Sequence, residues 1–118
     1  MASSSVRRSI AAICVAVLAT LAAPRAQQPF VPEVGQAGKD VVWVPSTPEI
    51  IEKMLDMANV TKNDFVIDLG SGDGRIVIAA AKRGARAMGV EFNPKMVELS
   101  KQNAAKEGVA DRVTFVEL

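Results

Sequence analysis

Residues 64–75, DFVIDLGSGDGR, constrain the fold of this chain more than any other segment. The apolar run 65–67 ends in an acid, Asp68, and a helix-forming stretch begins at Arg75. Between them, glycines occupy alternate positions: Gly70, Gly72 and Gly74. A buried strand that turns sharply into a helix, with little side chain at the turn, gives this order of residues. The segment therefore predicts an α/β fold.

A second acid, Glu91, ends the next predicted strand, about 20 positions after the glycine turn. In open α/β sheets, ligands bind at the carboxyl ends of the strands, and doubly wound folds hold a ribose diol with an acid at this spacing. The two acids and the glycine turn together indicate a site for an adenosine-containing cofactor.

The remaining elements follow the same alternation. The first helix is expected to start with Ser46 and Glu49 as a capping box, or with Thr47 as the cap before Pro48. Its predicted apolar stripe consists of Ile50, Ile51, Met54, Leu55 and Ala58. Strands are expected over 65–68, 85–91 and 113–118, and helices over 75–83 and from 94 to about 107.

These elements predict a Rossmann-like open parallel sheet with flanking helices. Right-handed crossovers would stack the second and third strands on one side of the first. The other edge of the first strand, Phe65 to Asp68, would then lie open, which natural domains avoid. We therefore expect residues 45–118 to form the front half of a larger domain: a helix, then three strands.

Composition excludes several kinds of site. Histidine is absent and Cys14 is the single cysteine, so histidine bases, histidine metal ligands, disulfides and CxxC sites are ruled out, and no metal site is expected. Arg7, Arg8 and Arg25 fall in the first 26 residues, which contain no acid. Without them, 11 basic residues face 13 acidic ones, a net charge of −2. We expect no nucleic-acid partner, because no basic run remains.

Residues 1–26 have the pattern of an export signal. A basic start precedes a continuous apolar run, 10–23, which is shorter than the roughly 20 residues that span a bilayer. Cleavage after Ala22, Ala23 or Ala26 fits equally well. The segment predicts an exported, periplasmic or membrane-anchored protein that meets a membrane only through this segment. The alternative is a mitochondrial presequence, although such peptides are amphipathic.

Residues 27–44 contain prolines and glycines with little periodicity, and they read as a linker that becomes extended near its end. Trp43, the only tryptophan, falls in that extended part.

Charge distinguishes between cofactors. A dinucleotide turn, G-x-G-x-x-G/A, needs a small residue at position 75, where this chain has Arg75. Asp68, directly before the turn, suits a cationic ligand better than a pyrophosphate. S-adenosyl-L-methionine carries an ammonium and a sulfonium group, so the charges favour this methyl donor over NAD or FAD.

The segments 66–74 and 89–91 resemble the first and second motifs of class I S-adenosylmethionine-dependent methyltransferases. The sequence of 68–78, DLGSGDGRIVI, is similar to small bacterial members with export signals and to mitochondrial protein-lysine methyltransferases. It resembles the DOT1-like histone methyltransferases more distantly. Residues 44–48, VPSTP, resemble the V-P-T-P segment of the same group.

The resemblance implies the cofactor-binding residues. Asp68 and the turn residues Gly70, Ser71, Gly72 and Gly74 would surround the methionine moiety. Glu91 would accept hydrogen bonds from both ribose hydroxyls, Phe92 would flank the adenine, and Thr47 would close over the methionine end.

The acceptor and the catalytic residues stay unassigned at this stage, because the family motifs that form the acceptor side follow the third strand. A protein lysine is slightly favoured over a small molecule. Two alternatives remain open: an NAD- or FAD-dependent oxidoreductase, and a non-catalytic binding module that keeps the fold.

Overall fold

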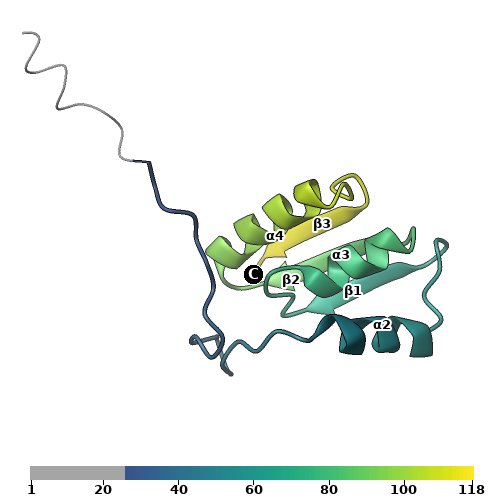
Figure 1. The fold of residues 1–118 in the computed structure, drawn as a ribbon, viewed down its shortest axis with the longest axis horizontal. Coiled ribbons are helices and arrows are strands. Elements are labelled where there is room, and N and C mark those ends of the chain that lie inside the picture. The colour runs from purple at the N-terminus through teal and green to yellow at the C-terminus, as the bar shows by residue number, and fades with distance from the viewer. Residues whose placement is uncertain (1–25) are drawn as a thin grey trace, which may run out of the picture.

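The computed structural model describes residues 26–118, so the expected export segment lies almost wholly outside the described residues. Helices and strands alternate along the chain (Figure 1): α2 (Pro48–Met57), β1 (Phe65–Leu69), α3 (Arg75–Lys82), β2 (Arg86–Glu91), α4 (Pro94–Lys106) and β3 (Val113–Glu117). From β1 onward, each bound lies within one residue of the bound predicted from the sequence.

The three strands form one parallel sheet in the order β1-β2-β3. In the register of the sheet, Asp68 lies beside Gly89, and Gly89 lies beside Phe115. This arrangement confirms the open parallel sheet, with the second and third strands on the same side of the first. Because all the strands are parallel, their carboxyl ends meet at one edge, which is where ligands bind in such sheets.

The two faces of the sheet differ in burial. Helices α3 and α4 pack on one face, and α2 lies alongside, packed against α3 (Figure 1). On the other face, Phe65, Ile67 and Leu69 of β1 are 56%, 51% and 78% exposed. The apolar pattern of β1 predicted burial on both faces, but the described residues cover only one of them.

The core lies between the helices and the sheet. Its buried members are Ile51, Leu55, Val77, Ile78, Ala80, Ala81, Ala87, Val97, Ala104, Val109 and Phe115. Only Ile51 and Leu55 of the predicted α2 stripe are buried, while Ile50 and Met54 are exposed. The predicted stripe was therefore too wide, because α2 packs against one neighbouring helix and one row of side chains suffices for that contact.

The structure decides between the two possible starts of the first helix. Thr47 is the N-cap of α2, its Oγ1 accepting a 3.4 Å hydrogen bond from the backbone N–H of Ile50, and Pro48 takes the first helical position. Asn93 caps α4 in the same way, before Pro94. None of the helices built by residues 26–118 has the length and apolarity needed to cross a membrane.

Candidate functional site: a cavity at the carboxyl ends of the strands

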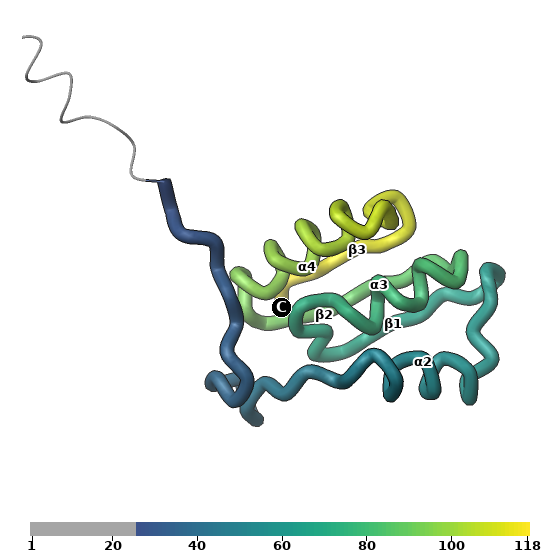
Figure 2. The backbone as a smooth tube through the Cα atoms, viewed as in Figure 1, coloured from purple at the N-terminus to yellow at the C-terminus, as the bar shows by residue number. Residues whose placement is uncertain are grey.

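A cavity of about 530 Å³ opens at the carboxyl ends of β1 and β2. This volume lies within the range of small-molecule sites, roughly 300–1,000 Å³. The residues that line it are Gln36, Ala37, Gly38, Lys39, Asp40, Val41, Val42, Trp43, Val44, Leu69, Gly70, Val90, Glu91, Phe92, Asn93, Met96 and Leu118. Figure 2 shows how the chain before α2 passes this end of the sheet. We call residues 36–46 the wall segment.

The glycine turn is hydrogen-bonded to the end of the neighbouring strand. The backbone N–H groups of Gly70 and Ser71 both donate to the carbonyl oxygen of Val90, at 2.8 and 3.0 Å. The N–H of Gly74 donates to the carbonyl of Ser71 at 2.9 Å. A Cβ at Gly70 would meet nothing within 4 Å, so this peptide unit is open to a ligand. The backbone therefore borders the cavity at Gly70 with no side chain in the way.

Glu91 joins the turn to the start of α4. Its side chain is inside the protein, with 7% of the residue exposed. One carboxylate oxygen, Oε2, accepts from the N–H of Gly72 at 2.8 Å, and the other, Oε1, accepts from the N–H of Asn93 at 3.0 Å. A carboxylate has about four lone-pair sites, so both oxygens keep capacity for further donors. Hydroxyl groups entering the cavity would find an acceptor that is already oriented.

Two of the glycines make room for protein rather than for ligand. A Cβ at Gly72 would lie 2.6 Å from Nε1 of Trp43, and one at Gly74 would lie 2.9 Å from Cβ of Ser100 and from the ring of Phe115. Both have positive φ angles, which glycine adopts without strain. The sequence-based interpretation had these glycines clear the ligand side, but they allow the wall segment and α4 to approach the turn.

Two polar residues of α4 hold the turn from behind, and sequence reasoning missed both. The Ser100 hydroxyl donates to the carbonyl of Gly72 at 2.9 Å, and the Asn103 side-chain amide donates to the carbonyl of Asp73 at 3.1 Å. They lie three positions apart, so they share one face of the helix. That spacing was the only signal in the sequence, and it is too common to have identified them.

Asp68 lies at the end of β1, in register with Gly89. Burial, and then the negative charge of Glu91, raise the pKa of Asp68 above its ordinary value. Two carboxyl groups at one edge of the sheet thus give the site a negative potential. A cation would relieve this repulsion, whereas an anionic pyrophosphate would add to it.

The predicted site residues fall into three groups. Gly70, Glu91 and Phe92 line the cavity, with Phe92 40% exposed. Asp68, Ser71, Gly72 and Gly74 lie in or beside the turn behind it; the Ser71 hydroxyl is buried over Gly89 without a hydrogen-bond partner. Thr47 lies at the start of α2, outside the cavity lining.

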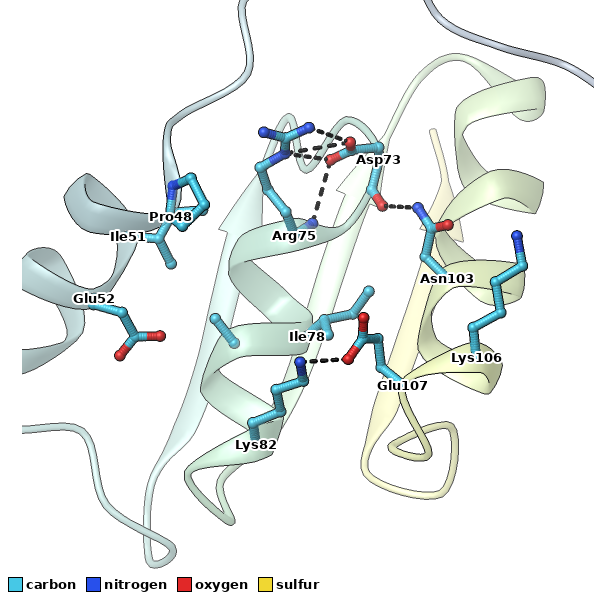
Figure 3. A pocket seen from close by; sticks show the side chains of 11 residues that line it. Pro48, Ile51, Glu52, Asp73, Arg75, Ile78, Lys82, Asn103, Lys106 and Glu107 are labelled. Atoms are coloured by element: carbon cyan, nitrogen blue, oxygen red, sulfur yellow. Dashed lines mark hydrogen bonds and ion pairs between the residues drawn. The ribbon is translucent and has the colours of Figure 1, made fainter.

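Asp73 and Arg75 form an ion pair where the turn enters α3, with Nη2 of Arg75 2.6 Å from Oδ2 of Asp73. The sequence suggested that Arg75 would face solvent, but its guanidinium binds Asp73 and the carbonyl of Ser46. A second hollow, of about 370 Å³, lies over α3 between α2 and α4, with this ion pair at its upper end (Figure 3).

Within residues 26–118, no cluster of three or more potential metal ligands forms. The groups that border the cavity are carboxylates, backbone amides and an apolar lining.

Residues 68–118 match the family described as the ANTKMT methyltransferase domain. A protein-lysine N-methyltransferase of Saccharolobus islandicus is 41% identical over 78 residues, which cover 64% of this chain and 48% of that protein. A lysine N-methyltransferase of Homo sapiens, named for the ATP synthase, is 47% identical over 73 residues, covering 62% of this chain and 31% of that protein. The chain thus spans between about a third and a half of these relatives.

Solved structures agree with the fold. A crystal structure of an RNA methyltransferase from Salinibacter ruber in complex with S-adenosyl-L-homocysteine is 46% identical, with a TM-score of 0.63; the similarity covers 64% of this chain and 50% of that one. A SAM-dependent methyltransferase from Geobacter sulfurreducens, also with S-adenosyl-L-homocysteine, is 32% identical, with a TM-score of 0.58, over 61% of this chain and 29% of that one.

Proposed function

We propose that this chain, which belongs to the class I S-adenosylmethionine-dependent methyltransferases, forms the cofactor-binding part of an enzyme that transfers a methyl group from S-adenosyl-L-methionine. The family match and the methyltransferase relatives confirm the resemblance drawn from the sequence, including the resemblance to the mitochondrial lysine-methylating group. The activity of the whole protein is our proposal, since the chain covers only part of each relative.

One observation carries the proposal. The buried Glu91 carboxylate is fixed by two backbone N–H groups at the rim of the cavity, where it can accept from a diol. Gly70 offers bare backbone beside it, and Phe92 offers an exposed aromatic ring. The raised pKa of Asp68 reflects an excess of negative charge that a cationic ligand would neutralise. These groups fit a sulfonium-bearing nucleoside.

When bound, S-adenosyl-L-methionine supplies a methyl group that is already activated for in-line displacement. The protein then contributes alignment and exclusion of water rather than an elaborate catalytic apparatus. Glu91 orients the ribose, Asp68 stabilises the positive charge, and the wall segment encloses the cavity. We assign no described side chain to deprotonation of the acceptor.

Calorimetric titration of the intact protein tests the proposal. We expect S-adenosyl-L-homocysteine to bind and NADH not to bind, and Glu91→Ala to weaken the binding of S-adenosyl-L-homocysteine. Binding of NADH alone would favour the oxidoreductase alternative. The structure offers that alternative little support, since the long side chain of Arg75 stands where a dinucleotide turn needs a small residue and is bonded to Asp73. Failure of both ligands to bind would favour a non-catalytic module.

For the acceptor, we propose a lysine side chain of a protein. The two lysine methyltransferase relatives support this choice. The RNA methyltransferase structure supplies the competing candidate, but the net charge of −2 outside the first 26 residues would repel a polyanion. Incubation with radiolabelled S-adenosyl-L-methionine and a cell extract should label protease-sensitive material. Label that is removed by ribonuclease would contradict the proposal.

We further propose that residues 1–26 direct the protein out of the cytosol or anchor it in a membrane, as their sequence indicates. S-adenosyl-L-methionine is made in the cytosol, so a twin-arginine route for the folded, loaded protein, or an anchor that leaves the domain in the cytosol, would reconcile location with cofactor. The alternative is a mitochondrial location. Cell fractionation with N-terminal sequencing tests this, and a cleaved, Sec-dependent, cofactor-free product would count against it.

A further inference from the structure

Arg75 is held in a fixed orientation by Asp73 (Figure 3). Its Nε donates to Oδ1 of Asp73 at 2.9 Å, and its Nη2 donates to Oδ2 at 2.6 Å, so the pair is bidentate. The side chain of Asp73 is 13% exposed and that of Arg75 36%, which shields the pair partly from solvent. A bidentate fork fixes the plane of the guanidinium as well as its position.

The remaining edge and the face of the same guanidinium reach the wall segment. Nη1 donates to the carbonyl oxygen of Ser46 at 2.9 Å. Cζ lies 6.0 Å from the centroid of the Trp43 ring, at the outer limit of a cation–π interaction. Arg75 therefore links the cofactor turn to two places on a segment about 30 positions earlier in the chain.

Trp43 in turn holds the part of the wall segment that lines the cavity. Its backbone N–H donates to the carbonyl of Gln36 at 2.9 Å, and its carbonyl accepts from the N–H of Gly35 at 2.8 Å, which closes residues 36–43 into a loop. Its ring lies against Gly72, where a side chain would collide with Nε1. Displacement of Trp43 would therefore move one whole side of the cavity.

We propose that Arg75 is a positioning residue, which fixes the wall segment over the cofactor cavity through Ser46 and Trp43 while Asp73 orients its guanidinium. This inference rests on the function proposed above for the same cavity, and it adds a residue that does not line that cavity. It also gives a reason for an arginine at the place where dinucleotide turns have a small residue: the position is used to attach the wall segment.

The test uses the fluorescence of Trp43, the only tryptophan of the chain, in the intact protein, with Trp43→Phe as the background. Acrylamide quenching measures how exposed the ring is, with no ligand present. Calorimetry with S-adenosyl-L-homocysteine measures affinity separately. We expect Arg75→Ala to raise the quenching constant and to weaken affinity about tenfold, as loss of a hydrogen bond from a charged donor does.

Arg83→Ala is the matched control. Arg83 follows α3, and it also joins an earlier segment, donating to the carbonyl of Glu52 at 3.1 Å and pairing with the carboxylate of Asp56 at 2.8 Å. It binds α2 and not the wall segment. This variant should therefore leave both Trp43 quenching and affinity unchanged, whatever it does to the melting temperature.

Two further variants keep the test decisive if Arg75→Ala does not fold. Arg75→Lys keeps the charge but lacks the fork, and Asp73→Asn weakens the orienting pair; each should raise Trp43 quenching by less than Arg75→Ala. Wild-type quenching and affinity in these variants would overturn the proposal. If the wild type does not bind S-adenosyl-L-homocysteine, the proposed function fails, while the ligand-free quenching result still decides the role of Arg75.

Discussion

Replacement of Glu91 by glutamine tests how the cofactor turn is held. The carboxylate serves two backbone donors at once, the N–H of Gly72 at 2.8 Å and the N–H of Asn93 at 3.0 Å. Glutamine has a single carbonyl oxygen, so it can serve one of them, and its NH2 group must then face the other N–H. One buried donor is left unpaired, and the remaining bond loses its charge.

The cost follows from these contacts. Loss of a charge-assisted hydrogen bond in a buried place destabilises a protein by about 1.5–3 kcal/mol. In a domain of this size, each kcal/mol lowers the melting temperature by about 4–8 °C, so a decrease of roughly 10 °C is expected for Glu91→Gln. The change also removes a negative charge that raises the pKa of Asp68, so that pKa should fall. Affinity for S-adenosyl-L-homocysteine should fall about tenfold, because one acceptor for the ribose becomes a donor.

Thermal unfolding followed by circular dichroism, together with calorimetry, checks these values. Glu98→Gln is the control, since Glu98 is exposed on α4 and accepts only from the Gln102 side chain at 3.1 Å, and such surface changes stay within about 0.5 kcal/mol. A Glu91→Gln protein as stable as Glu98→Gln would refute the role of Glu91 in holding the turn. Unchanged affinity would refute its role as the ribose acceptor.

Three other substitutions have defined outcomes. Gly89→Ala should destabilise by about 1–3 kcal/mol in urea unfolding, because the new methyl group would lie 2.5 Å from Oγ of Ser71 and 2.8 Å from the Phe115 ring. Asp68→Asn should raise the melting temperature at neutral pH more than at acid pH while weakening cofactor binding. The raised pKa of Asp68 means that the folded state holds its proton longer, so wild-type stability declines as pH rises through that interval. Thr47→Ala should cost about 0.5–1 kcal/mol as a lost helix cap, and should leave affinity within about twofold.

Each of these has a contrary result. A Ser71→Gly background should recover part of the loss in Gly89→Ala, and equal losses in both backgrounds would place the collision elsewhere. A pH-independent difference between Asp68→Asn and wild type would show that the charge of Asp68 carries no penalty. A large loss of affinity in Thr47→Ala would support the contact with the cofactor that the family resemblance implies for Thr47.

Local sequence patterns were sufficient for the elements of this fold. The alternation of an apolar run, a glycine turn and a helical stretch around Gly70 set the bounds of β1 and α3 within one residue. Caps such as Asn93 before Pro94 marked the helix starts. These features succeed because they depend on neighbours in the chain: backbone geometry at glycine, the missing N–H of proline, and the direction of side chains.

Burial was harder to predict than the elements themselves. Met54 and Met96 have the same side chain and both lie on helices, yet the first is exposed and the second is buried beside the cavity. The difference comes from what packs against each helix. No property of the residue or its neighbours in the sequence carries that information.

The sequence by itself determined which groups the site can use: two strand-end acids, bare backbone at the turn and an aromatic residue after Glu91. Only the tertiary structure decided how the site is enclosed. Arg75 looked solvent-facing and Trp43 looked like part of a linker, yet the fold brings them together across about 30 positions, against Gly72. The physical reason is that one guanidinium can bind Asp73 beside it and Ser46 far from it in sequence, and such a long-range contact leaves no periodic pattern along the chain.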